Sequence, residues 1–152
     1  MLRSIVCLMI LMSVSSVEAD MSESRLIADM SESRLIAETI SRESSGNFDE
    51  MVAIGKVLRN RKDTGWYGDS YISVILSKSQ FSCWNEGTIQ EERTKEQLDN
   101  AALAFELSSL KSDFPANLYH LADMKKYPSW TKANNVKRLC QVGAHIFYEE
   151  RR

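Results

Sequence analysis

The stretch ESSGNFDEMVAIGKVLRNR, residues 43–61, contains an acid, a glycine and then a long helical pattern. Gly46 interrupts the chain, and Asn47 is a favourable N-cap, with acidic residues in the first turn that follows. Glycine inside a helix costs stability relative to alanine, so Gly55 indicates close packing against a neighbouring element. Apolar residues recur at helical spacing, which predicts a helix with one buried face. The stripe comprises Phe48, Met51, Val52, Gly55 and Leu58.

The flanking sequence predicts more helices and little sheet. Thr94 and Gln97 form a capping-box pattern at the start of one helix. Residues Asn117–Asp123 are predicted as a short strand or an extended loop. We therefore expect a mainly α fold, of α+β type with a minor sheet, in a single domain. Besides the helix after Asn47, the predicted helices are 31–42, 71–76, 94–109 and 132–148.

Composition is that of a globular domain of ordinary size. The chain has 152 residues, of which 43% are hydrophobic and 26% charged, and its formal net charge is −2. This balance gives no indication of a nucleic-acid partner. The sequence contains no phosphate-binding glycine loop, CxxC or HExxH motif, so no cofactor and no metal are predicted. His120, His145, Cys83 and Cys140 are not spaced as pairs of zinc ligands.

The first 19 residues have the order of a signal peptide. A positive charge precedes a short uncharged apolar run, and small residues at Val17 and Ala19 fit a cleavage site. Export to the periplasm, cell wall or exterior is therefore expected, and contact with a membrane only through this segment. A buried N-terminal helix and an uncleaved anchor are the alternatives. Cleavage would leave Cys83 and Cys140, which can form a disulfide or remain two separate thiols.

ADMSESRLI occurs twice in tandem, at Ala19–Ile27 and Ala28–Ile36. Nine residues rotate a helix by about 900°, so equivalent side chains of the two copies lie on opposite faces. The second copy continues into a predicted helix and is expected to pack. The first is expected to be a dispensable extension. The predicted organisation is a signal peptide or anchor at 1–19, a duplicated extension at 20–34 and the folded domain at 35–152.

Glu43 is followed by two serines and a glycine, which leave space for a ligand beside its carboxylate. A lone glutamate is usually a solvated helix residue. However, three other segments, QFSCW, YPSW and NLYH, combine aromatic rings with polar groups. Such a mixture suits a carbohydrate groove and would equally suit a protein core.

Five segments, in this order, resemble the cell wall hydrolase family that includes the spore cortex-lytic enzymes. The spacing from Glu43 to Val52 is one residue shorter than is common in that family. Asn47 lies where many members carry a second acid. The five segments are ESSG (43–46), VAIGKVLRNR (52–61), QFS (80–82), LYHLADMKKYPSW (118–130) and VGAHIFYEE (142–150).

The resemblance implies a single lysozyme-like or lytic-transglycosylase-like domain that acts on the glycan strands of peptidoglycan. It further implies a lytic transglycosylase, in which Glu43 alone serves as acid and base and forms 1,6-anhydro-MurNAc ends. The alternatives are a muramidase-type hydrolase or phage-type endolysin, and a non-catalytic wall-binding protein. A monomer without cofactor or metal is expected. The substrate-binding residues implied are Gln80, Phe81, Ser82, Tyr119 and His120.

Other residues of these segments are predicted to be structural. His145 is expected in the core of the last helix, and Arg61 is expected to brace its helix by pairing with an acid or a backbone carbonyl. Asp49 and Glu50 could also supply an acid, but their position favours a helix-start role.

Overall fold

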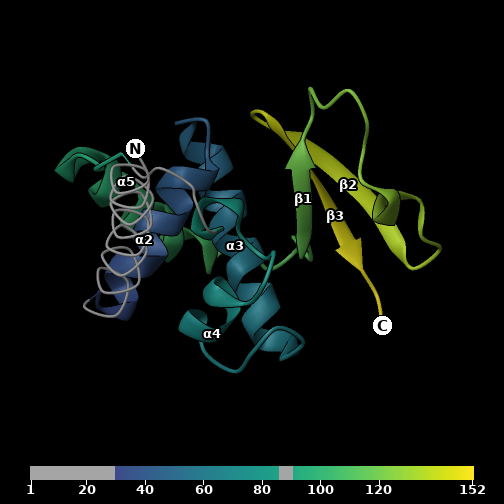
Figure 1. The fold of residues 1–152 in the computed structure, drawn as a ribbon, viewed down its shortest axis with the longest axis horizontal. Coiled ribbons are helices and arrows are strands. Elements are labelled where there is room, and N and C mark those ends of the chain that lie inside the picture. Colours follow the sequence, from purple (N-terminus) through teal and green to yellow (C-terminus); the bar gives the residue numbers. More distant parts are fainter. Residues whose placement is uncertain (1–29, 86–90) are drawn as a thin grey trace, which may run out of the picture.

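The computed structural model describes residues 30–85 and 91–152. The predicted signal peptide and the first copy of the repeat lie outside these residues. Helices form one side of the molecule and a three-stranded sheet forms the other, which confirms the mainly α fold with a minor sheet (Figure 1). The elements are α2 (Glu32–Glu43), α3 (Phe48–Thr64), α4 (Tyr71–Leu76), η1 (Ser82–Trp84), α5 (Lys95–Ser108), β1 (Leu118–Leu121), η2 (Ser129–Lys132), β2 (Val136–Val142) and β3 (His145–Glu150).

The helices begin at residues whose side chains satisfy free backbone N–H groups. The Ser31 side chain accepts from the backbone of Arg34, and the Asn47 side chain accepts from the backbone of Glu50 at 3.1 Å. The predicted capping box of α5 is present. These caps confirm the predicted starts of α2, α3 and α5.

The core lies where α2, α3 and α5 meet. A Cβ added at Gly55 would lie 3.3 Å from the Cα of Phe105 and from the Cβ of Ser108, which confirms that this glycine permits close approach of α3 to α5. The second repeat copy contributes Leu35 and Ile36 to this core. Phe48 was predicted to be buried, but 37% of its surface is exposed. The core side chains with no exposed surface include Ile40, Ile54, Val57, Leu58, Val74, Ala101 and Ala104.

The predicted last helix, 132–148, is wrong. Lys132 is the last residue of η2, and the residues from Val136 form a hairpin of β2 and β3, with Gly143 at φ +56° in the turn. The apolar residues of this segment are mostly β-branched or aromatic, and they suit a strand as well as a helix. β3 lies between β1 and β2 and is antiparallel to both, so its backbone is paired on both sides. Pairing with distant β1 is a tertiary contribution that local periodicity does not report.

Strand β1 carries two predicted site residues, Tyr119 and His120, between the helices and β3. Tyr119 is opposite Phe147 in the register, and their ring centroids are 5.7 Å apart. Phe147 is fully buried and also contacts Phe114, which follows α5. The sheet is thereby fixed against the helical side.

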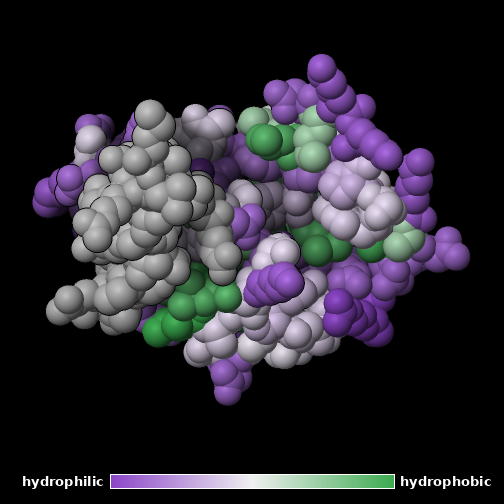
Figure 2. Space-filling view, in the orientation of Figure 1, coloured by the Kyte–Doolittle hydropathy of each residue, from purple (hydrophilic) through white to green (hydrophobic). Residues whose placement is uncertain are grey.

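On the face shown in Figure 2, the coloured surface is mostly neutral to hydrophilic, and apolar residues gather in a few separate patches. None of the helices within residues 30–85 and 91–152 is long and apolar enough to span a membrane.

Candidate active site

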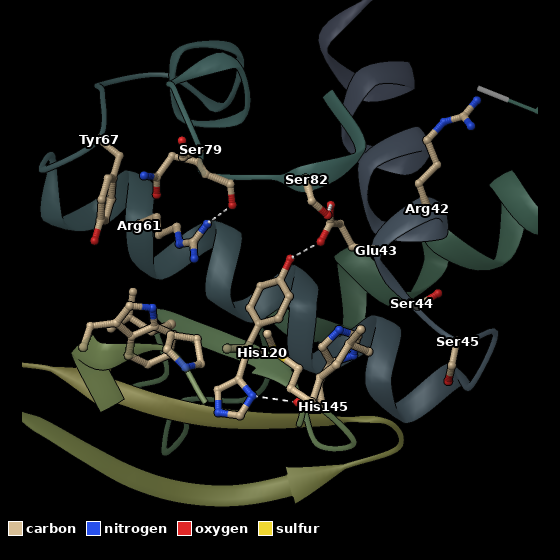
Figure 3. A pocket seen from close by; sticks show the side chains of 17 residues that line it. Arg42, Glu43, Ser44, Ser45, Arg61, Tyr67, Ser79, Ser82, His120 and His145 are labelled. Atoms are coloured by element: carbon tan, nitrogen blue, oxygen red, sulfur yellow. Dashed lines mark hydrogen bonds between the residues drawn. The ribbon is translucent and has the colours of Figure 1, made fainter. Parts of the chain in front are cut away.

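A cavity of about 800 Å³ lies where the end of α2 and the segment before η1 face β1 and the loop that leads to η2. This volume lies in the range of small-molecule binding sites. Figure 3 shows the side chains around it. The lining residues are Arg42, Glu43, Ser44, Ser45, Arg61, Tyr67, Ser79, Gln80, Ser82, Leu118, Tyr119, His120, Leu121, Met124, Pro128, Trp130 and His145.

Glu43, the last residue of α2, presents its carboxylate to this cavity (Figure 3). Its Oε1 accepts hydrogen bonds from the backbone N–H of Cys83 at 2.9 Å and from the Ser82 hydroxyl at 3.2 Å. Its Oε2 accepts from the Tyr119 hydroxyl at 2.9 Å. Donors from η1 and from β1 therefore fix the carboxylate from two sides.

The Tyr119 ring is held in place by the sheet. Its centroid lies 5.1 Å from the His145 ring, edge to face, and close to Phe147 as described above. Burial, and then the negative charge of Glu43, raise the pKa of the Tyr119 phenol well above its ordinary value. The phenol therefore keeps its proton and remains a hydrogen-bond donor to Glu43.

Glu50, predicted as a helix-start residue with an acid role as the alternative, is fully buried and connects several parts of the site. Its Oε1 accepts from the backbone N–H of Ala144 at 2.7 Å and from Nδ1–H of His145 at 2.8 Å. Its Oε2 accepts from the backbone N–H and, at 2.6 Å, from the hydroxyl of Ser45. Burial would raise the pKa of Glu50, but these hydrogen bonds together lower it below its ordinary value.

Glu50 therefore joins the loop after Glu43 to the β2–β3 turn. His145 was predicted in a helix core. It is buried at the start of β3, and its ring also lines the cavity. The positions of Glu50 and His145 in the chain gave no sign of this contact, because it depends on a hairpin that was predicted as a helix.

Both ring nitrogens of His120 are engaged inside the protein. A carbonyl oxygen can only accept, so Nδ1–H donates to the Leu121 carbonyl at 2.7 Å, and Nε2 then accepts from the Tyr148 hydroxyl at 2.9 Å. The ring lies beside Tyr127 and Trp130, with centroids 4.5 and 5.8 Å away. His120 thus presents ring surface to the cavity within an aromatic wall.

The predicted QFS segment divides between the cavity and the layer beneath it. Gln80 and Ser82 line the cavity. Phe81 is almost fully buried, and its ring centroid lies 4.9 Å from the guanidinium carbon of Arg61. Of the predicted substrate-binding residues, the structure therefore brings Gln80, Ser82, Tyr119 and His120 to one cavity with Glu43, and places Phe81 behind them.

Asn60 and Arg61, at the end of the opening motif, hold α3 to the segment before β1. The Asn60 amide donates to the carbonyls of Phe114 and Ala116 at 2.9 and 2.7 Å. The Nε–H of Arg61 donates to the Asn117 carbonyl at 2.7 Å. Of the two predicted kinds of partner for Arg61, the structure shows backbone carbonyls.

The structure does not form the disulfide considered between Cys83 and Cys140. Cys83 is buried in η1 beside Glu43, whereas Cys140 is exposed on β2 and lines a different, smaller cavity. Burial, together with the nearby carboxylate of Glu43, raises the pKa of the Cys83 thiol far above its ordinary value. Within the described part of the chain, no group of three or more His, Cys, Asp or Glu residues could hold a metal ion.

Comparison with known proteins places the chain in a family. The profile of the Cell Wall Hydrolase family matches residues 45–148, a range that begins two residues after Glu43. The fold is similar to the crystal structure of the catalytic domain of the Bacillus cereus SleB protein, with a TM-score of 0.61 and 22% sequence identity over 76% of this chain and 88% of that one. No curated protein sequence matches this one. The chain therefore belongs to the cell wall hydrolase family, and it is a peptidoglycan-cleaving enzyme.

Proposed function

We propose that this protein is a lytic transglycosylase that cuts the bond between MurNAc and GlcNAc, with Glu43 as its single acid and base. The observation that carries the proposal is the composition of the cavity wall. Among the described residues that line the cavity, Glu43 is the one carboxylate. Hydrolytic glycosidases commonly place two carboxylates on either side of the scissile bond. A transglycosylase that uses the substrate's own hydroxyl needs one.

In the first step, protonated Glu43 donates its proton to the glycosidic oxygen, and the bond from that oxygen to C1 of MurNAc breaks. In the second step, the oxygen of the MurNAc C6 hydroxyl forms a bond to C1. The Glu43 carboxylate accepts the proton that this hydroxyl loses. The product is a 1,6-anhydro-MurNAc end, and Glu43 is protonated again. No water is consumed and no net proton is released.

The partners of Glu43 suit both of its protonation states. A hydroxyl group is both a donor and an acceptor, so Ser82 and Tyr119 can donate to the carboxylate and accept from the carboxylic acid after rotation. The backbone N–H of Cys83 stabilises the carboxylate that is left after proton donation. Gln80 is well placed for a hydrogen bond to the sugar or its N-acetyl group, and His120 supplies part of the aromatic wall.

The glycan strands of peptidoglycan are the proposed substrate, and an exported monomer is the proposed form of the protein. The order of residues 1–19 supports export. Mass spectrometry of the mature N-terminus tests whether residues 1–19 are removed, and so distinguishes a cleaved form from an anchored one.

The test is a digestion of purified peptidoglycan by the wild-type protein and by Glu43→Gln, with products identified by mass spectrometry. Anhydro ends from the wild type and a loss of about 10²- to 10⁴-fold in the variant are expected, the range for general acid–base catalysis. Asp49→Asn is the matched control, since it makes the same carboxyl-to-amide change at an exposed residue outside the cavity. Reducing ends would indicate a muramidase-type hydrolase instead. Full activity of Glu43→Gln would overturn the role of Glu43.

A further inference from the structure

Arg61 is a nearly buried cation in the wall of the same cavity. Only 4% of the residue is exposed, yet it lines the cavity that holds Glu43. In the view of Figure 3 its guanidinium stands between Tyr67 and Glu43.

Two backbone carbonyls fix the guanidinium. In addition to the bond from Nε to Asn117, one N–H of Nη1 donates to the Gln80 carbonyl at 2.9 Å. A guanidinium has five N–H groups, so these two bonds set its plane and leave other donors available. Three rings surround it, with centroids 4.9 to 5.7 Å from its central carbon: those of Phe81, Tyr67 and Tyr119. The donor fork is therefore held in one orientation before any ligand arrives.

No carboxylate of the described chain forms an ion pair with Arg61. Glu43 is hydrogen-bonded by Ser82, Cys83 and Tyr119, and the Glu150 carboxylate pairs with Arg152 at 3.2 Å. Arg42, the other arginine of the cavity wall, is different in this respect, because its Nη2 lies 2.9 Å from Glu38.

A buried charge without a counter-ion in direct contact is unfavourable for folding. Burial lowers the pKa of Arg61 from its ordinary value, and the nearby Tyr119, Tyr67 and Glu43 act in the opposite direction without a hydrogen bond to the guanidinium. An arginine side chain stays protonated in proteins. Backbone carbonyls satisfy hydrogen bonds but do not neutralise the charge. An anion that enters the cavity would give this guanidinium a directly paired counter-ion.

We propose that Arg61 is the base of a carboxylate subsite, which takes a carboxylate carried by the muramic acid residue beside the cleaved bond. This inference rests on the proposed function and adds a substrate requirement to it. Muramic acid bears a lactyl group, which ends in a carboxylate where no peptide is attached. Where a stem peptide is attached, that group is an amide and the peptide carries carboxylates of its own. A planar guanidinium binds either carboxylate through two parallel hydrogen bonds. Tyr67 and Gln80 border this subsite on the cavity wall.

Tyr119 lies between this subsite and the carboxyl group of Glu43. Its hydroxyl donates to Glu43, and its ring contacts Arg61. A substituent held by Arg61 therefore lies on the side of Tyr119 away from the carboxyl group of Glu43. The subsite would set the register of the glycan so that a muramic acid, and not its neighbouring glucosamine, is presented to Glu43.

The test uses the wild-type protein and two pairs of substrates. One pair is peptide-free glycan with its lactyl carboxylates either free or converted to primary amides. The other is glycan with stem peptides whose carboxylates are either free or amidated. Amidation removes the charge that would bind Arg61. We therefore expect it to raise KM about tenfold in at least one of the two substrate pairs, with little change in kcat. The affected pair identifies the source of the carboxylate. Equal KM values within both pairs would overturn the subsite.

Arg61→Met should abolish the discrimination, and Arg61→Lys should retain part of it, because lysine keeps the charge but not the fork. Arg138→Met, an exposed arginine of β2 outside the cavity, is the control. Since Arg61 also braces α3, circular dichroism must show that each variant is folded. If a variant is not folded, the KM values of the wild-type protein on the two pairs of substrates decide whether the subsite exists.

The two proposals fail in different ways. Anhydro ends formed at equal KM from all four substrates would overturn the subsite and leave the transglycosylase intact. No cleavage of any substrate would overturn both.

Discussion

Glu50 and His145 are 95 residues apart in the chain, and Oε1 of Glu50 lies 2.8 Å from Nδ1 of His145. Because a carboxylate can only accept, Nδ1 carries the proton. The bond joins the start of α3 to the start of β3, and Ser45 joins the same carboxylate from the loop that follows Glu43. A single buried acid thus fixes the loop after Glu43 against the sheet that carries Tyr119.

Glu50→Gln should destabilise the protein in a pH-dependent way. The pKa of Glu50 is lowered in the folded state, so its carboxylate contributes stability above its ordinary value of 4.5, and this contribution is lost as pH falls through the folded pKa. At neutral pH we expect a loss of about 1–3 kcal/mol, typical of hydrogen bonds to a charged group.

The measurement is the free energy of unfolding by urea between pH 7 and pH 3. The difference between wild type and Glu50→Gln should shrink as the pH falls below about 4.5. A difference that is constant across this range would show that the charge of Glu50 does not stabilise the fold.

Gly143→Ala should disrupt the same contact from the other side. Gly143 has φ +56°, and an added Cβ would lie 2.7 Å from Oε1 of Glu50. Gly65→Ala is a matched control, because Gly65 has φ +68° but nothing within 4 Å of its added Cβ. Backbone strain should lower the free energy of unfolding of both variants by about 1–2 kcal/mol. Only Gly143→Ala should lose more than this, because its added Cβ meets Glu50. Thermal unfolding of the two side by side checks this, and equal losses would contradict it.

Tyr119→Phe should lower kcat on peptidoglycan with a smaller effect on KM. It removes the hydroxyl that donates to Oε2 of Glu43 but keeps the ring against His145 and Phe147. We expect a loss of about 10- to 100-fold, the scale of one hydrogen bond to a charged group. Tyr127→Phe, which removes an exposed hydroxyl bonded only to the Ala122 carbonyl, should retain activity. A Tyr119→Phe enzyme with wild-type kcat would remove Tyr119 from the mechanism.

The two cysteines of the described domain should react at different rates. Cys140 is exposed, whereas Cys83 is buried and the pKa of its thiol is raised. Iodoacetamide at pH 8 should label Cys140 in the native protein and Cys83 only after unfolding, as mapped by peptide mass spectrometry. Rapid native labelling of Cys83 would show that η1 opens readily.

Most of the helical side could be predicted from local sequence. Ser31, Asn47 and Thr94 are N-caps by residue type, and Gly55 indicated a close contact, because capping and steric room act over a few residues. The membership of the family and the placement of Glu43 beside a polar, aromatic cavity also followed from short motifs.

Only the tertiary structure decided the sheet and the contacts that shape the site. The apolar spacing of residues 132–148 fits a helix, but pairing of β3 with β1 makes a hairpin more favourable. The bonds of Glu50 and those of Arg61 depend on which distant groups come within hydrogen-bond distance. The sequence by itself determined α2, α3, α4 and α5, the caps of α2, α3 and α5, and the place of Glu43 at a helix end, since these depend on neighbours along the chain. Long-range packing determined what surrounds that acid, since burial and electrostatics depend on neighbours in space.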